Sequence, residues 1–200
     1  MIAVIDYGVG NLYSVEKALT AVGAEVSVTS RAEDLTSSEK IVLPGVGAFG
    51  DCMKNLEKTG LIPTILEQIK NKKPLLGICV GLQILFEGSD ESPGVDGLKI
   101  FRGRVKKISA EGLKIPHMGW NKLEDFENAG IFAGLPEEVY FYFVHSYHAF
   151  PADKKIIAAT TRYGEKITAG IQSGNIFATQ FHPEKSGDVG LKILKNFVEL

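Results

Sequence analysis

The feature that most constrains the fold is a regular alternation, in the first half of the chain, between short strand-like runs and longer segments with helical spacing. Four such runs occur: IAVID (2–6), AEVSVT (24–29), KIVL (40–43) and PLLGI (74–78). The segments 12–22, 49–71 and 80–87 have the apolar spacing of helices, and Gly60 and Pro63 predict a break in the second of them. Strands that alternate with helices of this length predict βαβ units around a parallel sheet.

The second half of the chain changes to a strand-rich pattern. Its predicted strands are LKIFRGRVKKI (98–108), VYFYFVHSYHAF (139–150), KIIAATTRY (155–163), KITAGIQ (166–172) and NIFATQF (175–181). Ser173 and Gly174 stand between the last two like a hairpin turn, and Ser186 is placed to cap a closing helix. We therefore predict one α/β domain over residues 1–200, with a mixed, mostly parallel sheet and antiparallel strands in its C-terminal half.

The composition argues against several classes of protein. Of 200 residues, 44% are apolar and 23% are charged, which is typical of a folded globular chain. The net charge of −2 argues against a nucleic-acid partner, and no apolar stretch approaches the roughly 18 residues of a membrane helix. The start MIAVIDYGVGN lacks the basic region of a signal peptide. Cys52 and Cys79 form neither a disulfide framework nor a metal spacing, so we expect no metal and a reducing, cytoplasmic setting.

The stretch LLGICVGLQ (75–83) places Cys79 between two glycines at a predicted junction of strand and helix. Ligands of such sheets bind beyond the carboxyl ends of the strands, where this junction lies. A G-x-C-x-G turn has the logic of a nucleophile elbow, because the glycines leave room for a sharp turn and the helix N-terminus favours the thiolate. The Val80 N–H would face an oxyanion, and Gln83 shares the helix face of Cys79. The motif alone is equally compatible with a buried structural cysteine, the role that we predict for Cys52.

The stretch QFHPE (180–184) supplies a candidate base for this thiol. His182 ends a predicted strand, and Pro183 favours an extended conformation at His182. Glu184 follows two residues later, the spacing that puts two side chains on one side of an extended chain. A Cys-His-Glu triad could therefore form at the edge of the sheet. Taken alone, the tripeptide leaves open a surface turn with a solvated glutamate.

Two glycine-rich loops precede the cysteine. PGVGAFG (44–50) follows KIVL and reaches the same sheet edge, so Gly47, or Val46 if its peptide turns over, could donate an N–H to an oxyanion. This loop lacks the lysine pattern of a phosphate loop. GVGNLY (8–13) imitates a dinucleotide fingerprint, but Tyr13 replaces the third glycine and no acid ends the next strand. We therefore expect no nicotinamide cofactor.

Together, PGVGAFG, LLGICVGLQ and QFHPEKS resemble the class I (triad) glutamine amidotransferases in order and spacing. DYGVGN (6–11), PHMGWN (116–121) and YFVHSYHAF (142–150) are similar to one subfamily, the glutaminase subunits of imidazole glycerol phosphate synthase. The resemblance covers residues 1–200 and shows no departure at the triad positions. It implies the three-layer, flavodoxin-like fold of that family, in which helices flank a central mixed sheet.

The resemblance implies a role for each candidate residue. Cys79 is the nucleophile, His182 the acid and base, and Glu184 the carboxylate that orients the imidazole. Gly47 and Val80 supply the oxyanion donors. No cofactor is implied, since a thioester intermediate and water suffice to turn glutamine into glutamate and ammonia.

The resemblance also implies contacts to the substrate and to a partner. Gly47, Gln83, Ser146 and Tyr147 would surround the α-amino and carboxylate groups of L-glutamine. The partner would be a (β/α)₈-barrel synthase subunit, which forms a heterodimer with this chain and uses its ammonia to make imidazole glycerol phosphate and aminoimidazole carboxamide ribonucleotide. Asn11, Trp120 and Tyr142 are the residues that the family match favours for this interface.

Structural roles compete with functional ones at the aromatic and histidine positions. Trp120 lies in a predicted Pro- and Gly-containing loop, and core packing is an equally good account of Tyr140. We expect structural roles for the other histidines, with His145 helping to shape the site. Two other functions stay open: another triad glutaminase or γ-glutamyl hydrolase of a vitamin B6 or folate pathway, against which PHMGWN argues, and a non-catalytic domain with an idle cysteine.

Overall fold

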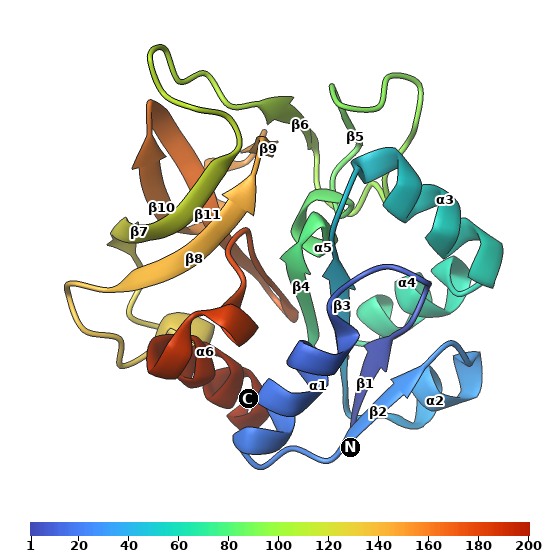
Figure 1. Cartoon of the computed structure of the whole chain (residues 1–200). Coiled ribbons are helices and arrows are strands. Elements are labelled where there is room, and N and C mark those ends of the chain that lie inside the picture. Colours follow the sequence, from blue (N-terminus) through green and yellow to red (C-terminus); the bar gives the residue numbers. More distant parts are fainter.

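The computed structural model describes residues 1–200, and half of its large sheet is parallel, as predicted (Figure 1). Five parallel strands lie in the order β2 (Val26–Thr29), β1 (Ile2–Ile5), β3 (Lys40–Gly45), β4 (Leu75–Cys79) and β12 (Ile176–Thr179). Strands β3 and β4 are buried along their whole length, which explains their continuous apolar sequences, whereas β2 is a half-buried edge strand. Because β3, β4 and β12 are neighbours and parallel, the segments that follow them meet at one edge of the sheet.

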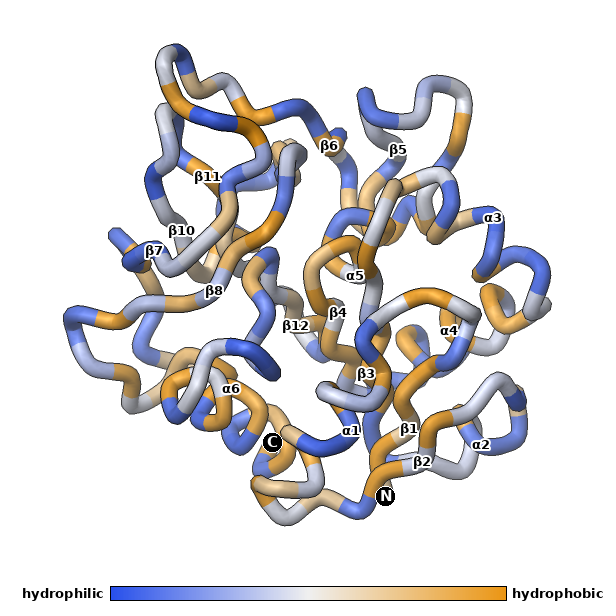
Figure 2. The backbone as a smooth tube through the Cα atoms, in the orientation of Figure 1, coloured by the Kyte–Doolittle hydropathy of each residue, from blue (hydrophilic) through white to orange (hydrophobic).

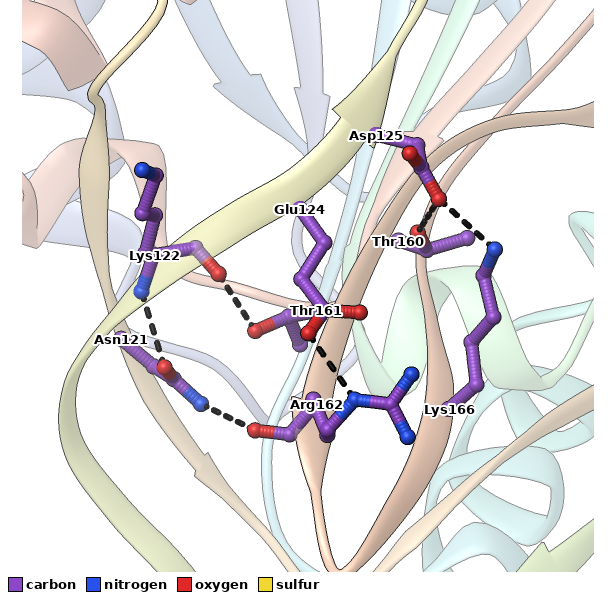
Figure 3. A network of polar contacts seen from close by, with 8 residues as sticks. All are labelled: Asn121, Lys122, Glu124, Asp125, Thr160, Thr161, Arg162 and Lys166. Atoms are coloured by element: carbon purple, nitrogen blue, oxygen red, sulfur yellow. Dashed lines mark hydrogen bonds and ion pairs between the residues drawn. The ribbon is translucent and has the colours of Figure 1, made fainter.

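Beyond β12 the sheet continues with antiparallel strands. Their order is β11 (Glu165–Ser173), β10 (Ile157–Tyr163), β7 (His117–Phe126) and β8 (Tyr140–His145). The hairpin between β11 and β12 turns at Gly174 and Asn175, since Ser173 already pairs with Ile176. Ion pairs such as Arg162–Glu124 at 2.9 Å and Lys166–Asp125 at 2.7 Å join β7, β10 and β11 on their exposed side (Figure 3).

Two predictions about this half are wrong. PHMGWN is not a loop, because its residues from His117 onward pair with β8 and place Trp120 opposite Tyr142. Residues 139–150 are not one strand, because the chain leaves the large sheet at Ser146. Its continuation is β9 (Tyr147–Pro151), which pairs with β6 (Gly103–Lys107) and, through it, with β5 (Gly88–Ser89) in a separate three-stranded sheet.

Six α-helices cover the large sheet. The helices α1 (Leu12–Ala21) and α6 (Gly187–Glu199) pack together on one face. The helices α3 (Phe49–Thr59) and α4 (Ile62–Lys70) lie on the other face, with α2 (Ala32–Ser37) against α4 (Figure 1). Gly60 ends α3 in the left-handed conformation, with φ +71°, which confirms the break predicted there.

The helix predicted over 80–87 is much shorter. It is the single turn α5 (Val80–Gln83), because the segment after it bonds elsewhere. The N–H of Leu98 donates to the Ile84 carbonyl at 2.8 Å, and that of Ile100 donates to the Leu85 carbonyl at 2.9 Å. These bonds also explain why the strand predicted over 98–108 begins only at Gly103.

The apolar core lies between the helix layers. Figure 2 shows hydrophobic residues gathered along β1, β3 and β4, at the centre of the molecule. The fully buried large side chains include Leu43, Phe49, Phe141 and Phe181. None of the helices combines the length and the apolar character needed to cross a membrane.

Candidate active site

Cys79 stands on a sharp turn between β4 and α5. Its backbone has φ +55° and ψ −109°, a conformation that a residue with a side chain rarely adopts. A Cβ atom at Gly77 would lie 2.8 Å from the Gly81 carbonyl oxygen, and one at Gly81 would clash with the Leu43 carbonyl. Both glycines are therefore required by close backbone approach, which is the geometry of a nucleophile elbow.

His182 and Glu184 lie on the segment that follows the neighbouring strand β12. The His182 Nδ1 atom is 2.8 Å from Glu184 Oε1, and both side chains are buried. The contact arises differently from the way the sequence suggested, because residues Pro183–Lys185 form a 3₁₀ turn, η3, that folds Glu184 back onto the ring. A carboxylate only accepts, so Nδ1 carries the hydrogen and the Nε2 atom is left for another partner.

The neighbouring Cys79 and Glu184 favour the protonated form of the His182 imidazole. Burial lowers the pKa of His182, but the contacts with Cys79 and Glu184 outweigh burial and raise this pKa to about 10. The contact with Cys79 is the larger of the two causes that raise this pKa, and the buried Nε2 atom has no other hydrogen-bond partner. The three side chains can therefore form a thiolate–imidazolium pair with a carboxylate behind it.

The backbone of His182 is fixed to strand β8. Its N–H donates to the Tyr142 carbonyl at 3.0 Å. The Ser186 hydroxyl donates to the His182 carbonyl at 2.7 Å and accepts the Tyr142 N–H at 3.0 Å. Ser186 precedes α6, as predicted, but its side chain does not cap the helix, because both of its hydrogen bonds hold this turn.

Cys79 and His182 open into one cavity of about 580 Å³. Glu184 lies behind His182 and does not line it, and Trp120 and Tyr142 lie apart from it on the β7–β8 hairpin. The cavity is also lined by most of the other residues that the sequence singled out: Asn11, Gly47, Val80, Gln83, Ser146 and Tyr147.

The PGVGAFG loop brings free backbone donors to the cavity. Gly47 has φ +87°, and no protein atom accepts the N–H of Val46, Gly47 or Val80. Helix α3 holds this loop, because the Cys52 thiol donates to the Val46 carbonyl at 3.3 Å. Cys52 is therefore a loop anchor as well as a core residue. N–H groups on two sides of Cys79 are suited to hold a negatively charged oxygen.

The sequence did not point to some of the residues at this site. Glu91 and Lys185 line the cavity, and Glu91 also accepts the Phe49 N–H at 2.8 Å. The Gln180 side chain lies 3.6 Å from the Cys79 sulfur through its Nε2 atom. Gln180 precedes His182 by two residues, so the period of an extended chain was a usable signal for it. Glu91 lies in a charged loop and gave no such signal.

A second cavity of similar volume, about 590 Å³, lies between β9 and the antiparallel strands. Asp125, Thr160 and Lys166 line it, together with the buried ring of His148. No cysteine reaches it, and its lysine is already paired with the aspartate at 2.7 Å. It therefore lacks the thiol nucleophile that the cavity at Cys79 combines with a base.

The raised pKa of His182 predicts how stability depends on pH. A group whose folded pKa is raised from 6.5 to about 10 stabilises the fold fully below pH 6.5, and this contribution is lost as the pH rises through 10. The Glu184→Gln variant keeps an acceptor for Nδ1 but loses the charge. We expect its free energy of unfolding in urea to fall less between pH 7 and 10 than that of the wild type. Parallel curves for the two proteins would contradict this account.

Known proteins of one family are similar to this chain over its full length. A family model described as glutamine amidotransferase class-I matches residues 3–200. The imidazole glycerol phosphate synthase subunit HisH of Methanothermobacter thermautotrophicus is 53% identical over 200 residues, which cover 100% of this chain and 98% of that protein. The subunit HisH 1 of Methanococcus maripaludis is 49% identical over 203 residues and is covered completely, as is this chain. The solved structure of PurLQS from Thermotoga maritima, 21% identical, has a TM-score of 0.74 over 99% of this chain and 97% of that one, which shows the same fold. This chain therefore belongs to the class-I glutamine amidotransferase family.

Proposed function

We propose that this chain is the glutaminase subunit of an imidazole glycerol phosphate synthase and hydrolyses L-glutamine to glutamate and ammonia. The observation that carries the proposal is a buried thiol that shares a cavity with a buried imidazole, which is paired in turn with a buried carboxylate. Relatives that bear the synthase-subunit name match the chain over its full length.

In the first half of the reaction Cys79 forms a thioester. Its thiolate attacks the carboxamide carbon of glutamine, and the carbonyl oxygen becomes an oxyanion held by the N–H of Val80 and by that of Gly47 or Val46. One such donor typically contributes roughly 3 kcal/mol to the stability of the transition state. The carbon–nitrogen bond then breaks as His182 gives its Nε2 proton to the nitrogen, which leaves as ammonia.

In the second half water releases glutamate. His182, now neutral at Nε2, takes a proton from a water molecule as its oxygen attacks the thioester carbon. The carbon–sulfur bond breaks, glutamate leaves, and the thiolate–imidazolium pair is restored. Glu184 keeps the Nδ1–H in place through both halves, so the same nitrogen always exchanges the proton.

The cavity offers groups that suit the charged end of glutamine. Glu91 and Lys185 carry charges that complement an ammonium and a carboxylate. Ser146 and Tyr147 add backbone polar groups to the cavity wall. The Gln83 Nε2 atom donates to the Tyr147 carbonyl and to Gln180. Its carboxamide oxygen is therefore the atom left for the substrate.

The exposed side of the β7–β8 hairpin suits a partner. Ammonia in neutral water is mostly protonated and is then not a nucleophile, so its use in synthesis requires a dry path out of this site. Trp120 is 58% exposed, and its ring lies 6.3 Å from that of Tyr142. Tyr140 and Met118 are also exposed on this hairpin, whereas single exposed apolar residues elsewhere are scattered. We propose that this face, with Asn11 at the cavity, contacts a (β/α)₈-barrel synthase subunit in a heterodimer.

The setting follows from the chemistry. Both cysteines are free, and the proposed nucleophile must stay reduced to act. We therefore propose a reducing, cytoplasmic location for the enzyme.

Mixing experiments test this assignment. We expect little glutamate release by the isolated chain and a strong rise when the barrel subunit of an imidazole glycerol phosphate synthase is added. Trp120→Ala should raise the Kd for that subunit by about 10-fold to 100-fold, because large buried aromatics dominate binding energy. Titration calorimetry and a glutamate assay measure the two effects.

Leu66 provides the matched control, since it is an exposed apolar residue on α4, away from the hairpin. Leu66→Ala should bind the barrel subunit as the wild type does. Activation by a synthase of a vitamin B6 or folate pathway, and not by the barrel subunit, would reassign the chain to the corresponding glutaminase.

A further inference from the structure

A continuous series of buried and partly buried hydrogen bonds leads from strand β7 to the Cys79 sulfur. Apart from Gln83, its side chains have no role in the proposed mechanism. It begins at Asn121, whose Nδ2 atom is 3.1 Å from His117 Nε2. The His117 Nδ1 atom is 3.0 Å from His145 Nε2, and His145 Nδ1 is 2.9 Å from the Tyr147 carbonyl oxygen. This half of the series therefore ends on a backbone acceptor at the wall of the cavity.

The second half runs from the same carbonyl to the sulfur. The Gln83 Nε2 atom is 2.9 Å from the Tyr147 carbonyl oxygen and 3.0 Å from Gln180 Oε1. The Gln180 Nε2 atom is 3.6 Å from Cys79 Sγ. Gln180 is fully buried and lines no part of the cavity, so water has no access to its side chain.

The backbone carbonyls of Tyr147 and Arg162 determine which atom donates and which accepts in every bond of the series. A carbonyl only accepts, so Gln83 must present its nitrogen to Tyr147, and Gln180 must then present its oxygen to Gln83. The only part of the Gln180 carboxamide that remains to face Cys79 is its N–H. The amide orientation therefore follows from its neighbours.

The histidine half is directed in the same way. His145 must donate from Nδ1 to Tyr147, so its Nε2 accepts from the Nδ1–H of His117. Asn121 in turn donates to His117, and the same nitrogen also donates to the Arg162 carbonyl at 2.9 Å, a contact drawn in Figure 3. The order donor to acceptor is thus fixed at both ends.

Burial keeps this series in one protonation state. It lowers the pKa of His117 to about 4 and that of His145 to about 3, so both rings are neutral near pH 7. The His117 ring also stacks on Phe143 and Tyr163, with centroids 4.9 Å and 4.2 Å away, which prevents it from turning over. One tautomer of each histidine is therefore selected.

We infer that Gln180 is held by Gln83 with its N–H directed at the Cys79 sulfur, where it fixes the nucleophile and stabilises the thiolate. Gln83, His145 and His117 act through it as positioning residues. The inference rests on the proposed glutaminase function. It adds a donor to the sulfur that is separate from the oxyanion donors and from His182. The sulfur is anionic before attack and again after the thioester is hydrolysed, so the donor acts at both moments.

Two variants separate a directed donor from simple packing. Gln180→Met fills a similar volume without an N–H, and Gln180→Glu keeps the shape and the acceptor for Gln83 but places oxygen beside the sulfur. In the complex with the barrel subunit, we expect kcat for glutamine hydrolysis to fall about 10-fold to 100-fold in Gln180→Met, and further in Gln180→Glu. The KM for glutamine should change little, because Gln180 does not line the cavity.

The decisive readout is the alkylation of Cys79 by iodoacetamide as a function of pH. Loss of the donor should move the midpoint of this curve upward by about one pH unit in Gln180→Met, and by more in Gln180→Glu. Other ionisable groups surround the thiol, namely His182, Glu184, Tyr7, Cys52, Glu91, Lys185 and His145. They are present in all the proteins compared, so the difference between curves reports on residue 180.

Gln68 is the matched control, because it is a buried glutamine on α4 that lines no part of the cavity. Gln68→Met should keep both kcat and the alkylation midpoint, and ammonium-dependent synthesis by each complex shows that the variant is folded. A Gln180→Glu protein with unchanged kcat and midpoint would overturn the inference. A wild-type complex that releases no glutamate would instead overturn the proposed function, and the alkylation curves would still test the donor.

Discussion

Replacement of Cys79 by alanine should abolish glutamate release by the complex, while added ammonium continues to support synthesis by the barrel subunit. The expected loss is roughly 10⁴-fold or more, because no other group at the site can form the thioester. The second thiol cannot substitute, since Cys52 is fully buried on α3 and donates to the Val46 carbonyl. Parallel assays with glutamine and with ammonium salts separate the two activities.

Cys52→Ala is the matched control for this experiment. It removes a buried thiol of the same kind but leaves the nucleophile, so the ability to form the thioester should persist even if the loop at Val46 is less well held. A Cys79→Ala complex that released glutamate at the wild-type rate would exclude the thioester mechanism. Equal, complete loss in both variants would point to the loop rather than to the sulfur.

Replacement of Gly81 by alanine should have the largest effect on stability. The added Cβ would clash with the Leu43 carbonyl oxygen. Leu43 lies on β3, which is held between β1 and β4, so its backbone cannot shift to relieve the clash. We expect a loss of more than about 3 kcal/mol in the free energy of unfolding, together with loss of activity. Urea unfolding of the purified variant measures the effect, and a failure to accumulate folded protein agrees with it.

Gly60 provides the comparison, because glycine is favoured there by the backbone conformation and not by a close contact. It ends α3 with φ +71° and has open space where a Cβ would stand, so the cost of Gly60→Ala comes only from the left-handed backbone. That cost is about 1 to 2 kcal/mol. A Gly81→Ala protein as stable as Gly60→Ala would show that the elbow is not tightly packed against β3.

Local patterns were sufficient to predict strands β1 to β4 and the tight turn at Cys79. The buried strands β3 and β4 are continuous apolar runs, and the elbow is visible because only glycine fits on both sides of Cys79. The edge strand β2 showed its half-buried state through alternation. Each of these signals lies within a few residues of the feature that it predicts.

The features that were missed depend on contacts between distant segments. The helix after Cys79 stops early because Leu98 and Ile100 bond to its continuation. The chain changes sheets at Ser146, within a run that has uniform strand propensity. Gln180 faces the sulfur because Gln83 and the Tyr147 carbonyl orient it. Pattern along the chain carries no information about such partners, since the bonds join residues 14 to 97 positions apart.

The adjacency of β4 and β12 has a consequence for biosynthesis. The strand that carries Cys79 leaves the ribosome about a hundred residues before the one that leads to His182. Until β12 is synthesised, one edge of β4 has unpaired backbone N–H and C=O groups. The residues of β4 are apolar and are buried only in the folded protein, and such exposed strands readily pair with other chains. The nascent protein is therefore both inactive and prone to aggregate until its last fifth emerges. The pairing of β12 with β4 then covers the exposed edge and brings His182 to Cys79.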